Sequence, residues 1–109
     1  MPRPGDVVLV DFPGVKVVKR RPAVVVSTAT YHSVRPDAIL ALLTSQASKA
    51  TAPTDYVLKD WGKAGLLQPT ALRVFLATLP TANISVIGHL SARDWEEVKS
   101  RLRLAIEVS

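Results

Sequence analysis

Short apolar runs, each ended by proline, glycine or a polar stretch, are the feature that most restricts the fold of this chain. They are rich in Val, Ile and Leu, as β-strands are. The runs occupy residues 7–12, 22–27, 37–44, 55–59, 73–79 and 85–88. The run 22–27 is almost continuously apolar, which predicts a strand buried on both faces. Five or six short strands within 109 residues predict a small β-barrel.

The length and composition predict a single domain that spans residues 1–109. Hydrophobic residues make up 48% of the chain and charged residues 21%, far from the composition of disordered segments. The longest apolar run, residues 38–43, is much shorter than a bilayer-crossing helix, and the N-terminus lacks the apolar stretch of a secretion signal. We therefore expect a cytoplasmic protein that does not enter a membrane.

Several kinds of chemistry are disfavoured by the residues present. The chain has no cysteine, which excludes disulfides, thiol nucleophiles and thiolate metal sites. The two histidines, His32 and His89, are far apart in sequence and belong to no metal-binding pattern, so we expect no metal. The glycines match no phosphate-binding loop, and no serine has the Gly-x-Ser-x-Gly surroundings of a hydrolase nucleophile.

The positive charge is concentrated in the first third of the sequence. Fourteen Lys and Arg against nine Asp and Glu give a net charge of +5. Most of this excess precedes residue 37, where the basic residues are Arg3, Lys16, Lys19, Arg20, Arg21 and Arg35. Such a concentration attracts phosphate backbones or an acidic protein, although a basic surface often serves only solubility.

The C-terminal segment has the pattern of an amphipathic helix. Ser91 is a good N-cap, acidic residues dominate the first turns, and basic residues follow later, which complements the helix dipole. Trp95, Val98, Leu102 and Ile106 recur at intervals of three and four and should pack on the sheet.

Polar residues gather where two predicted strands begin or end. A basic stretch, residues 15–21, is predicted to form a loop, so Arg20 and Arg21 directly precede one strand, and Thr44, Ser45 and Gln46 end or follow another. On a barrel these residues can share one rim. A guanidinium beside a hydroxyl suits RNA cleavage, in which the 2′-hydroxyl attacks the phosphorus and charge grows on the phosphate oxygens. The alternative is that the arginines are solvated loop charges and Thr44 merely ends a strand.

Three segments together resemble a known family. They are Gly5-Asp6-Val7-Val8-Leu9-Val10-Asp11-Phe12, then Arg20-Arg21-Pro22-Ala23-Val24-Val25-Val26-Ser27, then Leu43-Thr44-Ser45. A terminal helix after Ile87-Gly88-His89-Leu90-Ser91 completes the pattern. In this order and spacing the chain resembles the MazF/PemK family of toxin endoribonucleases over nearly its whole length.

The resemblance implies an SH3-like β-barrel, similar to PemK and CcdB, with a C-terminal α-helix. It also implies a homodimer that cleaves single-stranded RNA at short sequences without a metal or cofactor. A protein antitoxin is the implied partner, and DNA would be contacted only indirectly, through the complex with that antitoxin.

The resemblance assigns catalysis to two positions, the Arg before the Pro, which is Arg21, and the strand-end Thr, which is Thr44. Many members carry a Gln-φ-Arg-Thr-φ-Asp stretch on a late strand, where φ is apolar; here residues 75–80 keep Thr78 and lack the Arg and Asp. An acid–base role for that pair cannot be transferred, and Arg73 is a substitute phosphate contact. Residues 61–69 resemble a subgroup of the family that has a Lys-or-Gln-Pro segment. The missing Arg and Asp therefore indicate ordinary variation within the family rather than a loss of activity.

RNA is expected to lie over the loops 14–20 and 45–54. Lys16, Lys19 and Arg20 are the candidates for phosphate contacts, and Ser45 and Gln46 for contacts with exposed bases. We favour a core role for Trp61 over stacking on a base, and packing for Trp95. His32 is predicted to be an ordinary surface residue of a loop.

Two other functions remain open. The chain could be a barrel of the same fold that binds RNA or DNA without cleaving it. A toxin of the same fold that poisons gyrase acts through an aromatic C-terminal tail, whereas this chain ends Ala105-Ile106-Glu107-Val108-Ser109.

Overall fold

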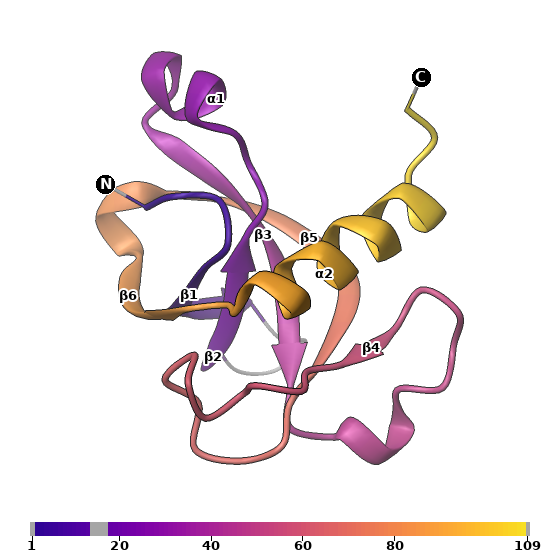
Figure 1. The fold of residues 1–109 in the computed structure, drawn as a ribbon. Helices are drawn as coiled ribbons and strands as arrows, with labels where there is room; N and C mark the ends of the chain where they lie inside the picture. The colour runs from indigo at the N-terminus through magenta and orange to yellow at the C-terminus, as the bar shows by residue number, and fades with distance from the viewer. Residues whose placement is uncertain (1, 14–17, 109) are drawn as a thin grey trace.

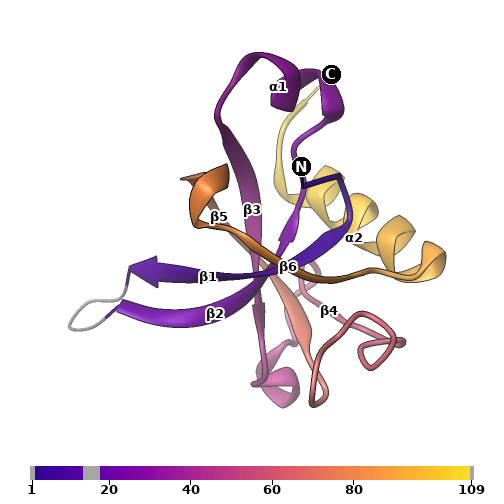
Figure 2. The ribbon, with the colours of Figure 1, turned by 90° about the vertical axis from the view of Figure 1, so that its left-hand side faces the viewer.

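A curled antiparallel sheet forms the body of the protein, which we describe from a computed structural model covering residues 2–13 and 18–108. Within these residues the sheet has six strands in the order β4-β5-β3-β2-β1-β6. The strands are β1 (Asp6–Pro13), β2 (Val18–Val25), β3 (Asp37–Thr44), β4 (Tyr56–Val57), β5 (Ala71–Pro80) and β6 (Ser85–His89). Figures 1 and 2 show the sheet curling into a half-barrel, and Figure 2 shows the β1–β2 pair projecting from it. The mostly β fold predicted from the sequence is confirmed.

Both faces of the central strands are buried, as predicted for residues 22–27. Successive strand residues point to opposite faces, so Val7 and Val24 enter one apolar cluster whereas Val8 and Val25 enter the other. The side chains of all four are fully buried. Continuous apolar runs therefore suit this sheet better than an alternating pattern would.

The C-terminal helix, α2 (Ala92–Ala105), begins where the sequence predicts. Ser91 is its N-cap and accepts a hydrogen bond from the amide of Asp94. Val98 is buried, Trp95 and Leu102 pack against the same cluster, and Figure 1 shows the helix lying across the sheet. The prediction was wrong for Ile106, which is the C-cap and is 36% exposed, because the helix ends before this residue can pack.

The first loop differs from its prediction. Lys19, Arg20 and Arg21 belong to β2, because their pairing with Phe12, Asp11 and Val10 extends the β1–β2 ladder. The remaining part of the predicted loop includes Lys16, which lies outside the described residues.

Two further segments also correct the sequence interpretation. The strand predicted for residues 55–59 is reduced to Tyr56–Val57, because the amides of Lys59 and Asp60 donate hydrogen bonds to the Asp94 carboxylate instead of to a neighbouring strand. The loop 45–54 contains a short 3₁₀ helix, η1 (Ala47–Lys49). A second one, η2 (Thr81–Asn83), joins β5 to β6.

A short helix, α1 (Ala29–Val34), was not predicted, and it changes the interpretation of His32. Thr28 caps this helix by accepting a hydrogen bond from the Tyr31 amide. His32 is buried, not a surface loop residue, and its Nε2 is hydrogen-bonded to Ser27 Oγ. Since Ser27 Oγ also accepts from the Ile39 amide at 3.0 Å, the pair ties α1 to β3.

Within the described chain, no helix has the length and apolar character needed to cross a membrane.

Candidate functional site

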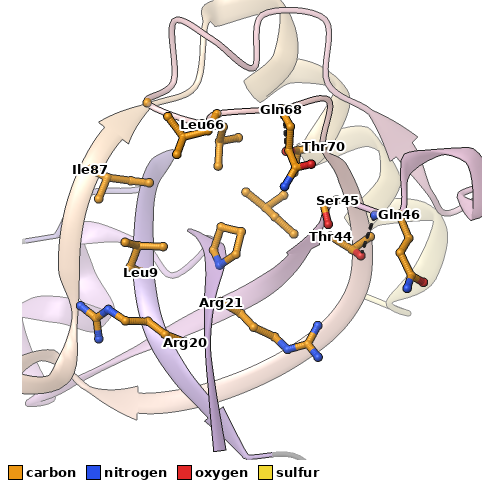
Figure 3. Close-up of a pocket in the computed structure, with 14 residues that line it drawn as sticks. Leu9, Arg20, Arg21, Thr44, Ser45, Gln46, Leu66, Gln68, Thr70 and Ile87 are labelled. Carbon is orange, nitrogen blue, oxygen red and sulfur yellow. Dashed lines mark hydrogen bonds between the residues drawn. The ribbon is translucent and has the colours of Figure 1, made fainter.

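A cavity of about 580 Å³ opens where β2, the end of β3 and the segment between β4 and β5 approach one another (Figure 3). Its volume lies in the range of small-molecule binding sites. The lining contains arginine, hydroxyl, amide and aliphatic side chains: Leu9, Arg20, Arg21, Pro22, Leu43, Thr44, Ser45, Gln46, Gly65, Leu66, Leu67, Gln68, Thr70 and Ile87.

Arg21 supplies a positioned positive charge. Its backbone is held in β2 by pairing with Val10, and the side chain is half-buried. Figure 3 shows its guanidinium on the side of the cavity where Thr44 and Gln46 lie. No acceptor within the described residues is hydrogen-bonded to this guanidinium or forms an ion pair with it, so its five N–H donors are available to an anion.

Arg20, the preceding residue, is in a different situation. Its Nη2 donates a hydrogen bond to Ser85 Oγ at 3.1 Å, and its Nη1 lies 3.6 Å from the carboxylate of Asp11. Figure 3 shows the Arg20 side chain directed away from that of Arg21, as expected for neighbours on a strand. Within the part of the chain that the structure describes, Arg20 therefore has partners and Arg21 has none.

Thr44 supplies a hydroxyl at the end of β3. It pairs with Ala71 of β5, which fixes its backbone in the sheet. Its Oγ1 accepts a hydrogen bond from the Gln46 amide at 3.2 Å. Because a hydroxyl can donate as well as accept, the Thr44 proton stays available to a bound molecule.

The third wall of the cavity, residues 65–70, is held by a close backbone contact. A Cβ built on Gly88 would lie 2.1 Å from the carbonyl oxygen of Ala64, and one built on Gly65 would lie 2.4 Å from that of Ile87. Gly65 also has a φ of +87°, which disfavours other residues. Two glycines thus let this segment lie directly against β6.

A buried carboxylate fixes the segment that leads into this wall. Asp94 of α2 is fully buried and accepts hydrogen bonds from Tyr56 Oη at 2.6 Å, the Lys59 amide at 3.0 Å and the Asp60 amide at 2.8 Å. Burial, followed by the bond to Asp94, raises the pKa of the Tyr56 hydroxyl well above its usual range. Tyr56 thus stays protonated and acts as a donor to Asp94.

Asp60 forms a second contact with the start of α2. Its carboxylate accepts two hydrogen bonds from Arg93, both 2.7 Å, and one from Ser91 Oγ at 2.6 Å. The bonds from Arg93 and then from Ser91 hold the pKa of the Asp60 carboxyl well below its usual range.

The structure brings five of the predicted site residues together and leaves Arg73 apart. Arg20, Arg21, Thr44, Ser45 and Gln46 all line the cavity. Arg73 is exposed on β5 and is not among the lining residues. Of the other two, Lys19 has its backbone in β2, and Lys16 lies outside the described chain.

The sequence interpretation missed the wall formed by Leu66, Leu67, Gln68 and Thr70. A signal was available in the Gly-Leu-Leu-Gln-Pro stretch, since two adjacent leucines between turn residues form neither a helical nor a strand pattern. Within residues 2–13 and 18–108, no three His, Asp or Glu residues are grouped so as to hold a metal ion.

Comparison with known proteins gives one family match. The sequence model of the family described as "PemK-like, MazF-like toxin of type II toxin-antitoxin system" matches residues 3–106. No curated protein matches the sequence significantly.

Solved structures share the fold over essentially the whole chain. MazF in a MazE–MazF crystal structure from Deinococcus radiodurans is 24% identical, with a TM-score of 0.74, and the match covers 99% of this chain and 97% of that one. An endoribonuclease from a mycobacterial species, in complex with its cognate antitoxin, is 18% identical with a TM-score of 0.76, and the match covers 100% of both chains. The Mycobacterium tuberculosis toxin MazF-mt6 is 16% identical with a TM-score of 0.75, over 95% of this chain and 98% of that one.

Proposed function

Because the chain belongs to the PemK-like, MazF-like toxin family of type II toxin–antitoxin systems, we propose that it is a sequence-specific endoribonuclease that cleaves single-stranded RNA without a metal. The observation that carries this proposal is the cavity that contains both Arg21 and Thr44. A guanidinium without a partner among the described residues and a hydroxyl with a proton to donate can bind the same phosphodiester.

In the proposed reaction the ribose 2′-oxygen attacks the adjacent phosphorus while the bond from phosphorus to the 5′-oxygen breaks. The 2′-hydroxyl loses its proton and the departing 5′-oxygen gains one, so the products are a 2′,3′-cyclic phosphate and a 5′-hydroxyl end. Negative charge on the nonbridging oxygens grows in the transition state, where preorganised donors are most effective.

Arg21 is suited to stabilise that charge. With a pKa above about 12, an arginine is a poor base at neutral pH, so its role is that of a hydrogen-bond donor and positive charge. Thr44 orients the phosphate or the 2′-hydroxyl. Ser45 and Gln46 border the same cavity and contact the neighbouring nucleotides, while Lys16, Lys19, Arg20 and Arg73 contact phosphates of the RNA.

The direct test is the rate at which Arg21→Ala cleaves a long unstructured RNA in EDTA. We expect a loss on the order of a hundredfold or more, as for removal of an oxyanion donor. Arg103→Ala is the matched control, because Arg103 is exposed on α2 and does not line the cavity. Cleavage at the wild-type rate by Arg21→Ala would refute the assignment, and wild-type protein that binds RNA but leaves it intact would identify a noncatalytic binding barrel.

The proposed partners follow from the same family. Two of the similar structures are complexes with an antitoxin, which supports neutralisation of this chain by a cognate antitoxin protein in the cytoplasm, with DNA bound only through that complex. We propose a homodimer as the active form. Sedimentation at the mass of a single chain under cleavage conditions would contradict it.

A further inference from the structure

We propose that Gln68 and Leu67 form a recognition site for one unpaired base beside the cleaved bond, and that the Gln68 amide selects the base. This inference rests on the proposed RNA cleavage and adds a specificity-determining residue to it. RNA sequence is commonly read by stacking unpaired bases and hydrogen-bonding their edges.

The cavity is divided between phosphate chemistry and base chemistry. Figure 3 shows the Arg21 guanidinium and the Gln68 side chain at different sides of the cavity, with Thr44 and Ser45 drawn between them. A nucleotide whose phosphate contacts Arg21 can direct its base toward Gln68 within the same cavity. The cavity volume of about 580 Å³ accommodates more than a phosphate group.

Gln68 is held in place by its backbone. Its carbonyl oxygen accepts a hydrogen bond from Thr70 Oγ1 at 2.8 Å, and Thr70 is only 2% exposed. Pro69 follows and restricts the chain further. The side-chain amide has no hydrogen-bond partner within the described residues, so its donors and acceptor are available to a ligand. Because the backbone is already fixed, less entropy is lost when the amide binds a ligand.

Leu67 gives the wall an apolar surface. Its side chain is 96% exposed and lines the cavity, whereas that of the neighbouring Leu66 packs against the core. The flat face of a base placed on Leu67 would remove this apolar surface from water. The close contact between Gly65 and β6 keeps the wall in position.

The hydrogen-bonding groups of the Gln68 amide determine which substitution would change the preferred base. A glutamine side chain offers a donor and an acceptor side by side, whereas a glutamate carboxylate only accepts. Among the bases, guanine presents two adjacent donors, N1–H and the N2 amino group, which match a carboxylate. Gln68→Glu should therefore move the preference at one position of the cleavage sequence toward guanine.

The test is to map the 5′ ends that wild-type protein, Gln68→Ala and Gln68→Glu create in one long RNA of varied sequence. Gln68→Ala should reduce discrimination at one position about 5- to 150-fold, the range for a bidentate base contact. The other positions should keep their preferences. Leu67→Ala should raise KM for all sites without changing the preferred base.

The control is Ala92→Glu, which adds the same charge at an exposed position in the first turn of α2, away from the cavity. It should leave the cleavage sequence unchanged. An identical cleavage sequence for wild type and both Gln68 variants would overturn this inference while leaving the proposed nuclease activity intact. Loss of all cleavage by both folded Gln68 variants would also overturn it, in favour of a catalytic role. Failure of the wild-type protein to cleave any RNA would refute the proposed function itself, and this inference with it.

Discussion

Replacing Asp94 by alanine should destabilise the protein strongly, even though Asp94 lies outside the cavity. Its carboxylate is fully buried and accepts hydrogen bonds from Tyr56 Oη and from the amides of Lys59 and Asp60. The alanine variant leaves all three donors without this acceptor. Each buried donor left unsatisfied costs about 1–3 kcal/mol, and the two amide donors are only partly buried, so the three together amount to about 3–5 kcal/mol.

We therefore expect the free energy of unfolding to fall by about 3–5 kcal/mol. For a domain of this size, about 4 °C of Tm corresponds to each kcal/mol, so Tm should fall by about 12–20 °C. This is a large share of the roughly 5–15 kcal/mol that stabilises a typical domain. Thermal unfolding followed by circular dichroism measures the change directly.

Glu97→Ala is the matched control, because it removes the same charge from the same helix. Glu97 is 44% exposed at its side chain and pairs with Arg101 at 3.2 Å. An exposed pair of this kind contributes about 0.5 kcal/mol, so Tm should fall by only about 2 °C.

A local measurement separates the proposed contacts from a general effect of the substitution. Hydrogen exchange at the amides of Lys59 and Asp60 should accelerate in Asp94→Ala beyond what the loss of global stability explains, because these amides lose their acceptor. Equal Tm losses in Asp94→Ala and Glu97→Ala, or unchanged protection of the two amides, would refute the reasoning.

Three further predictions concern the cavity wall, acid stability and RNA affinity. Gly88→Ala should lower cleavage activity and cost about 1–3 kcal/mol of stability, since the new Cβ would lie 2.1 Å from the Ala64 carbonyl oxygen; unchanged kinetics and Tm would contradict the close contact. The depressed pKa of Asp60 adds stability that is present above about pH 4 and is lost as pH falls further. Asp60→Asn should therefore make Tm less dependent on pH below about pH 4, and an unchanged dependence would refute this. RNA affinity should fall with salt at a log–log slope of roughly −2 if about three phosphates are contacted, and replacing Lys16 and Lys19 together should reduce the slope; an unchanged slope would remove both from the interface.

Family and fold could be predicted from the sequence because their determinants are local. Apolar runs bounded by turn residues located β1, β3 and β6, and the Ser91 cap located the start of α2. These features depend on neighbours in the chain, for which spacing and residue type suffice.

Tertiary contacts account for the failed predictions at His32 and at β4. His32 looks like a loop residue in sequence, and it is buried because the turn of the chain brings it against Ser27, whose hydroxyl also accepts from the Ile39 amide. Asp94 looks like an ordinary first-turn acid, yet its bonds to residues far upstream shorten β4. No local pattern reveals the partners of Asp94.

By itself, therefore, the sequence determined the strands, the terminal helix and the residue types at two strand ends. Only the tertiary structure decided that Arg21 and Thr44 line one cavity and that Gln68 lies across it. The physical reason is that two tertiary features place these residues around one cavity: the curl of the sheet, and the close approach of the Gly65 and Gly88 backbones. Each feature depends on contacts between segments far apart in the chain.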